Sequence, residues 1–195
     1  MRRMLVACSL VVFLAGFAWS VLGKEEQLKN GERLVVRLAP RDPRAFLLGD
    51  YMALNYAINR EVDKALFDCY TDGEDPRMTW SDRKKSLKKL PKDGVAVVRL
   101  DADQAVSFVR LDDGSPLGND ERRLHFRVSA RGANIAASAF YFQEGFAEDF
   151  ANAKYGELRV NAEGKSLLAH LLDDKLARIQ PQKAKPDAAL PAPTH

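Results

Sequence analysis

The N-terminal segment constrains this chain most, because the 19 residues of Met4–Leu22 carry no charge. A helix of about 20 apolar residues spans the hydrocarbon core of a bilayer. Arg2 and Arg3 precede the run, and Trp19 lies near its end, where the membrane interface favours tryptophan. We therefore predict a cytoplasmic stub and transmembrane anchor over residues 1–23, with the rest of the chain exported.

The same run has an alternative interpretation as a cleaved signal peptide. Ala18-Trp19-Ser20 is a small-x-small cleavage site. The apolar run continues past that site to Leu22, which favours retention as an anchor. The exported part then contains a single cysteine, Cys69, so we expect no disulfide within it.

Composition narrows the possible functions of the exported part. Thirty basic residues against 27 acidic ones give a net charge of +3, too balanced for a dedicated nucleic-acid binder. We find no phosphate-binding loop and no dinucleotide fingerprint, and we expect no cofactor. The three histidines, His125, His170 and His195, are too widely separated to give a metal-ligand spacing.

Alternating apolar residues predict a folded domain over residues 24–179 that is mostly strand. The clearest case is Arg122–Ser129, where Leu124, Phe126 and Val128 alternate with polar residues. Two further runs flank Asp101-Ala102-Asp103 and predict a hairpin. The strands that we expect are 33–38, 51–58, 94–100, 104–111, 122–129, 138–142 and 155–160.

Helical signals are fewer. Glu144–Ala153 places Phe146 and Phe150 four residues apart, and Ser81–Leu90 is a second candidate. Ser166–Ile179 fits either a helix or two short strands. We predict a mainly β or α+β fold, with one N-terminal transmembrane helix before a small antiparallel barrel- or sandwich-like domain containing one or two helices. The proline- and alanine-rich residues 180–195 are predicted to be a disordered tail.

One short motif is specific. Gly49-Asp50-Tyr51-Met52-Ala53-Leu54-Asn55-Tyr56 matches G-D-Y-x-x-L-x-Y at every fixed position. Flanking blocks occur in order: Arg37–Arg44 before it, Tyr141-Phe142-Gln143-Glu144-Gly145 after it, and Tyr155–Val160 near the end of the domain. From Arg33 to Leu172, the chain resembles the GDYxxLxY family of bacterial membrane-anchored proteins.

This resemblance implies a location and a kind of partner, but no activity. Its members are expected to be single-pass proteins of the bacterial inner membrane, with the C-terminal domain in the periplasm. They are also expected to be encoded beside multi-spanning membrane proteins, so the resemblance suggests a non-catalytic accessory role and such a protein as partner. The alternative is a ligand-binding module or hydrolase with a site near the turn at Gly49-Asp50-Tyr51. The side chains of Asp50 and Glu144 would contribute to that site.

A second resemblance bears on the hydrolase alternative. Signal-peptidase-like serine hydrolases also have a proline-containing turn followed by Gly-Asp at the start of a strand. Arg41 occupies the position of their nucleophilic serine, and no serine lies between Gly31 and Gly49. Because that mechanism needs the hydroxyl, we predict no catalytic residues of this type.

The motif also divides into two faces. With a period of two residues, Leu54 and Tyr56 share one face with Met52, and Tyr51 and Asn55 lie on the other. We expect Gly49 and Asp50 to form the preceding turn. Tyr51, Asn55 and Glu144 are therefore the candidate surface or binding residues. A basic cluster is a candidate for contact with anionic lipid and consists of Arg83, Lys84, Lys85, Lys88 and Lys89.

Overall fold

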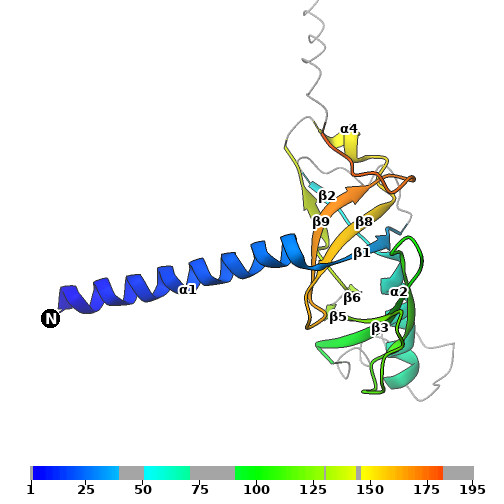
Figure 1. Ribbon diagram of the computed structural model, residues 1–195, viewed down its shortest axis with the longest axis horizontal. Coiled ribbons are helices and arrows are strands. Elements are labelled where there is room, and N and C mark those ends of the chain that lie inside the picture. Colours follow the sequence, from blue (N-terminus) through cyan, green and yellow to red (C-terminus); the bar gives the residue numbers. More distant parts are fainter. Residues whose placement is uncertain (1, 40–50, 71–90, 130, 144–145, 182–195) are drawn as a thin grey trace, which may run out of the picture.

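A long N-terminal helix projects from one side of a small β-rich domain (Figure 1). The computed structural model describes residues 2–39, 51–70, 91–129, 131–143 and 146–181. Its helices are α1 (Arg2–Asn30), α2 (Ala57–Tyr70) and the one-turn α4 (Ala147–Phe150). The strands are β1 (Glu32–Arg37), β2 (Tyr51–Ala53), β3 (Asp93–Leu100), β4 (Val106–Leu111), β5 (Glu121–Ser129), β6 (Gly132–Asn134), β7 (Ala139–Tyr141), β8 (Tyr155–Val160) and β9 (Ser166–Leu172).

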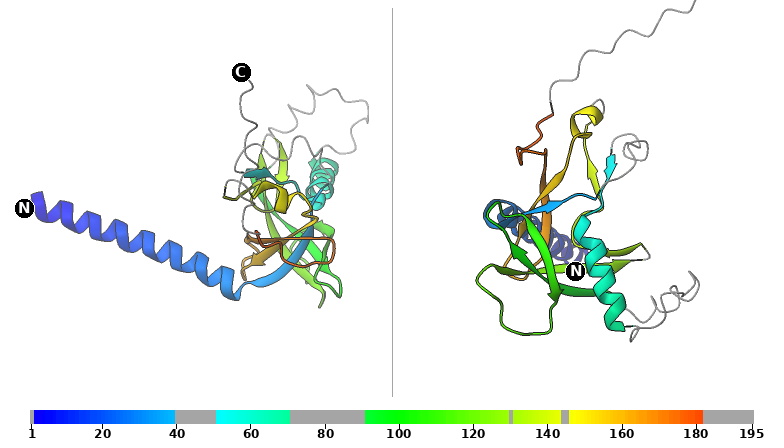
Figure 2. Two further views of the ribbon diagram at one scale, coloured as in Figure 1. Left: turned by 90° about the horizontal axis from the view of Figure 1, so that it is seen from above. Right: turned by 90° about the vertical axis from the view of Figure 1, so that its right-hand side faces the viewer.

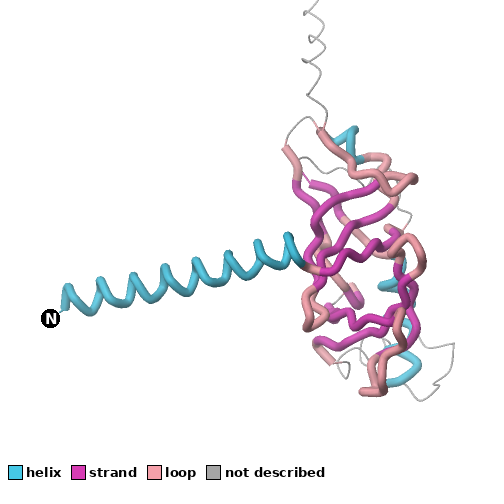
Figure 3. Tube along the Cα trace, viewed as in Figure 1, coloured by secondary structure: helices cyan, strands magenta, loops and turns pink. Residues whose placement is uncertain are grey.

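The strands form three antiparallel sheets with the orders β1-β8-β9, β2-β7 and β4-β3-β5-β6. They curve around a common core as a half-barrel, and α2 packs against β1, β4 and β6 (Figures 2 and 3). An isolated parallel bridge between Val35 and Ala105 links the first sheet to the segment before β4. The prediction of an antiparallel, β-rich domain with few helices is confirmed.

Alternation along the strands builds the core. Leu34 and Val36 of β1 lie inside, as do Leu124 and Phe126 of β5 and Leu158 of β8. Each is 2% exposed or less. Side chains two residues apart share a face of a strand, so the sequence pattern that predicted the strands also selects the residues that fill the half-barrel.

Most predicted strands are present. The hairpin around Asp101 exists as β3 and β4, and the other expected strands correspond to β1, β5, β7 and β8. Ser166–Ile179 follows its strand alternative, because β9 is followed by a turn that returns Arg178 to pair with Leu172. The helix expected over Glu144–Ala153 is present only as the single turn α4 within the described residues.

The strand predicted over Tyr51–Ile58 is wrong in its second half. Strand β2 ends at Ala53, and α2 begins at Ala57. The buried residues Ile58, Val62 and Leu66 then recur every four residues, as on one face of a helix. Ile58 continues the strand-like alternation of the residues before it and also begins the helical spacing of the residues after it. The predicted strand was therefore extended too far along the chain. Strand β6 was not predicted.

Helix α1 continues past the predicted domain boundary at residue 23 and ends only at Asn30. The Gln27 side-chain amide donates hydrogen bonds to the carbonyl oxygens of Arg159 (2.9 Å) and Lys165 (2.6 Å), which fixes the end of the helix to the sheet. Among the residues that the structure describes, no helix has the combined length and apolarity of a membrane span. The transmembrane anchor stays a prediction.

Candidate functional site

The described residues of the GDY motif pair with the strand that leads into the Tyr141-Phe142-Gln143 block. Strand β2, the described start of the motif, pairs antiparallel with β7. In this register Tyr51 lies opposite Tyr141, and Met52 lies opposite Phe140. Two segments that the sequence analysis singled out separately therefore form one two-stranded unit.

The inward face of the motif belongs to the core, as predicted. Met52 and Tyr56 are fully buried, and Leu54 is nearly so. The Tyr56 hydroxyl donates a hydrogen bond of 2.9 Å to the carbonyl oxygen of Ala137. Burial raises the pKa of Tyr56, so the ring remains a neutral phenol. Leu54 and Tyr56 thus hold the segment in place and are not available to a ligand.

The outward face carries a pair of tyrosines. The rings of Tyr51 and Tyr141 have centroids 5.7 Å apart and planes inclined by 38°. Tyr51 is half-buried, whereas Tyr141 is 75% exposed. Every other large hydrophobic side chain recorded as exposed in the described residues lies on α1. Tyr141 is therefore the exception within the described part of the domain.

The remaining predicted site residues do not join this pair in the described structure. Asn55 is half-buried, and its side-chain oxygen accepts a hydrogen bond from the Asn59 amide at 3.2 Å. This contact ties Asn55 to the first turn of α2. Gly49, Asp50 and Glu144 lie outside the described residues, as do the basic residues of 83–89.

An apolar pocket of about 310 Å³ lies beside Tyr141. Phe150 of α4 packs edge-on against Phe140 at 5.1 Å and stacks on Phe142 at 5.4 Å. This volume is at the lower end of the range for small-molecule pockets, about 300–1,000 Å³. Sequence reasoning placed Phe146 and Phe150 on one helical face but missed the pocket. Its lining residues are Phe140, Tyr141, Phe142, Gln143, Phe146, Phe150, His170, Leu171, Ile179 and Pro181.

A buried carboxylate, opposite the pocket-lining His170 in the β8–β9 ladder, is surrounded by arginines. Glu157 of β8 is fully buried. Arg178 pairs with both its oxygens at 3.0 and 3.1 Å, and Arg159 and Arg33 approach them at 3.1 and 3.4 Å. Burial alone would raise the pKa of Glu157, but hydrogen bonds and charges from Arg178 and Arg33 bring it below its usual value. The group holds an ionised glutamate and fastens the segment after β9 to the sheet.

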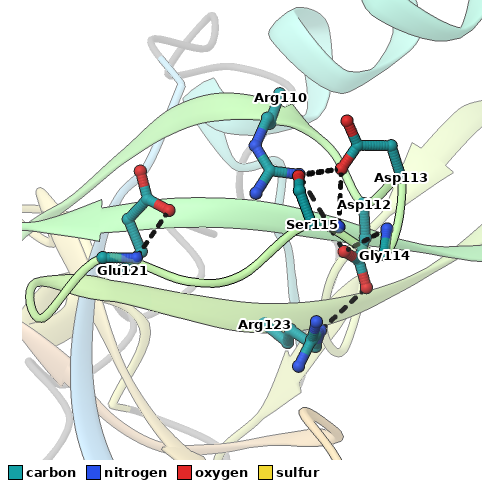
Figure 4. Close-up of polar contacts among 8 residues, drawn as sticks. Arg110, Asp112, Asp113, Gly114, Ser115, Glu121 and Arg123 are labelled. Carbon is teal, nitrogen blue, oxygen red and sulfur yellow. Dashed lines mark hydrogen bonds and ion pairs between the residues drawn. The ribbon is translucent and has the colours of Figure 1, made fainter.

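A second polar cluster shapes the loop after β4 (Figure 4). The hydrogen bond from Arg123 to Asp112, 2.8 Å long, is the main cause that lowers the pKa of that aspartate. Asp113 accepts hydrogen bonds from the hydroxyl and backbone N–H of Ser115, which lower its pKa. Arg110 adds a 2.6 Å contact to Asp113. Both carboxylates are thus engaged in holding a turn.

The aromatic edge, defined as Tyr51, Tyr141 and the adjoining pocket, presents side chains that are typical of binding surfaces. Tyrosine combines a large apolar surface with a polar tip, a combination enriched at interfaces. No group of three or more His, Cys, Asp or Glu side chains that could hold a metal gathers in the described parts of the chain.

Comparisons with known proteins give one result. The family model described as GDYXXLXY protein matches residues 13–171, which covers most of the chain and both segments of the aromatic edge. Neither the curated proteins nor the solved structures gave a significant match. On the extent of the family match, this chain belongs to the GDYXXLXY family.

Proposed function

We propose that this protein is a non-catalytic accessory protein of the bacterial inner membrane. In this proposal the apolar run Met4–Leu22 anchors it as a single-pass protein, and the β-rich domain lies in the periplasm. The domain binds a multi-spanning membrane protein through the aromatic edge. The anchor keeps the domain at the membrane surface, where such a partner is at high local concentration.

The exposure of Tyr141 carries the proposal. Tyr141 is 75% exposed and offers a large apolar surface with a polar tip, and aromatic anchors of this kind dominate binding energy at protein interfaces. Tyr51 supports the ring from one side. The adjoining pocket offers a partner a concave, largely aromatic surface that can accept an apolar side chain.

The pocket also favours a second candidate, a module that binds a small apolar ligand. Phe140, Phe142 and Phe150 would then contact the ligand directly. A hydrolase that uses Asp50 and Glu144 stays a prediction, because both residues lie outside the described structure.

Site-specific photocrosslinking distinguishes the first two possibilities. A benzophenone amino acid replaces Tyr141 in the full chain, and a matched chain carries it at the exposed Asp103, in the turn between β3 and β4. In native membranes, position 141 should cross-link to a multi-spanning protein identified by mass spectrometry, and position 103 should not. The same adducts at both positions would contradict a partner surface at Tyr141. A low-mass adduct at position 141 would favour the ligand-binding alternative.

A further inference from the structure

A second cavity, of about 670 Å³, lies where α1 joins the domain. Lys24 and Gln27 of α1 form one wall. The other walls come from the residues at the start of β3 and β9, from β5 and from the segment around β6. Its lining is Lys24, Gln27, Lys92, Asp93, His125, Phe126, Arg127, Asn134, Ile135, Ala136, Lys165, Ser166 and Leu167.

Positive charge dominates this cavity. Lys24, Lys92, Arg127 and Lys165 line it, and the single lining carboxylate is Asp93, which faces Arg127 across the β3–β5 ladder. Lys165 also contacts Glu163, a residue outside the lining, at 2.7 Å. After both carboxylates are counted, two positive charges remain in excess. The cavity therefore favours an anionic ligand.

Its walls are held in place before any ligand binds. The hydrogen bond from Gln27 to the Lys165 carbonyl joins the helix to the turn between β8 and β9. Within that turn, the Asn161 side chain accepts a hydrogen bond from the Lys165 backbone N–H at 2.9 Å. Gly164 takes a φ of +83°, a conformation that favours glycine. A preformed cavity reduces the entropy cost of binding.

The cavity also lies at a defined distance from the apolar run. At about 1.5 Å per residue, Lys24 and Gln27 lie about 3 Å and about 8 Å beyond Leu22 along the helix axis. The polar headgroup layer on each side of a bilayer is about 5–7 Å thick. If α1 is the anchor, the α1 wall of the cavity spans the depth of the lipid phosphates.

We propose that this cavity binds the phosphate group of an anionic phospholipid. The proposal rests on the anchoring part of the proposed function, but not on the partner. Lysine and arginine side chains pair with phosphate oxygens, and the acyl chains would lie beside the apolar part of α1. Such a lipid would fix the orientation of the domain relative to the membrane surface.

Lipid retention tests the assignment. The full chain is reconstituted into nanodiscs of phosphatidylcholine with a minor fraction of phosphatidylglycerol, re-extracted in mild detergent, and analysed for the lipids that stay bound. The test variant carries Lys92→Gln and Arg127→Gln. The control carries Lys154→Gln and Lys175→Gln, which remove the same charge from exposed positions outside the cavity lining. All four side chains are exposed, so the substitutions should leave folding intact.

The cavity pair should lower the ratio of bound phosphatidylglycerol to phosphatidylcholine about fivefold or more, since each cation near the surface contributes appreciably to anionic lipid binding. The control pair should leave the ratio unchanged. Equal effects of the two pairs, or no effect of either, would overturn the site. Displacement of the lipid by glycerol 1-phosphate would assign the cavity to a soluble phosphate ester and overturn the lipid assignment. A chain absent from the membrane fraction would instead contradict the anchor itself.

Discussion

The rings of Tyr51 and Tyr141 lie 5.7 Å apart on paired strands, although the residues are far apart in sequence. Tyr51 comes from the motif that names the family, and Tyr141 begins Tyr141-Phe142-Gln143-Glu144-Gly145, which resembles a second block of that family. Their pairing explains why both blocks can serve one surface. The inward neighbours Met52 and Tyr56 fix that surface to the core.

The Tyr56 hydroxyl gives a prediction about stability. Tyr56→Phe keeps the ring but leaves the carbonyl of Ala137 without this donor, which should lower the free energy of unfolding by about 1–2 kcal/mol. Tyr141→Phe removes an equivalent hydroxyl from an exposed ring and should change stability little. Denaturant unfolding of the two full-length variants measures the difference. Equal destabilisation by the two substitutions would show that the buried Tyr56 hydrogen bond stabilises the fold no more than the exposed Tyr141 hydroxyl does.

Glu157 gives a prediction about acid stability. Its pKa is lower in the folded state than in the unfolded chain, so its contribution to stability is present above about pH 4.5. That contribution should be lost as the pH falls through the folded-state pKa, below this value. Glu157→Gln should remove it at neutral pH and lower the free energy of unfolding by about 1.5–3 kcal/mol, the range for hydrogen bonds to charged groups.

The control for Glu157 is Glu61→Gln, on an exposed position of α2. Denaturant unfolding at neutral pH and at about pH 3.5 compares both variants with the natural chain. The difference in the free energy of unfolding between Glu157→Gln and the natural chain should be smaller at the lower pH. A difference of constant size would mean that the Glu157 charge does not determine the pH dependence.

Cys69 allows a direct test of topology. It is a free, exposed thiol at the end of α2, so a membrane-impermeant maleimide should label it in intact spheroplasts. Labelling should disappear in Cys69→Ser and persist in Cys8→Ser, because Cys8 lies within the predicted anchor. Labelling that requires permeabilised membranes would place the domain on the cytoplasmic side.

The sequence predicted those parts of the fold that depend on local alternation. Leu34, Leu124 and Leu158 mark strands whose two faces differ sharply in polarity, and these strands are present. Helix α2 was missed because Ile58 satisfies both the period of a strand and the spacing of Val62 and Leu66 on a helix. Local pattern alone does not separate the two where one element follows another directly.

The candidate site was only partly predictable for a different reason. The division of the motif into a buried face and a less buried face follows from alternation, since Met52, Leu54 and Tyr56 are buried and Tyr51 is only partly buried. The partner ring of Tyr141 and the pocket formed around Phe150 depend on the pairing of β2 with β7. Such long-range register is set by tertiary packing, and no spacing within either segment specifies it.

Tyr141 is proposed to bind a membrane partner and not to stabilise the fold. The most direct measurement compares Tyr141→Ala with Leu54→Ala in two assays on the full chain, recovery of the multi-spanning partner from native membranes and denaturant unfolding. Leu54→Ala should cost about 2–5 kcal/mol of stability by opening a core cavity. Tyr141→Ala should leave stability nearly unchanged and abolish recovery of the partner. Undiminished recovery with Tyr141→Ala, or unfolding as severe as that of Leu54→Ala, would contradict the claim.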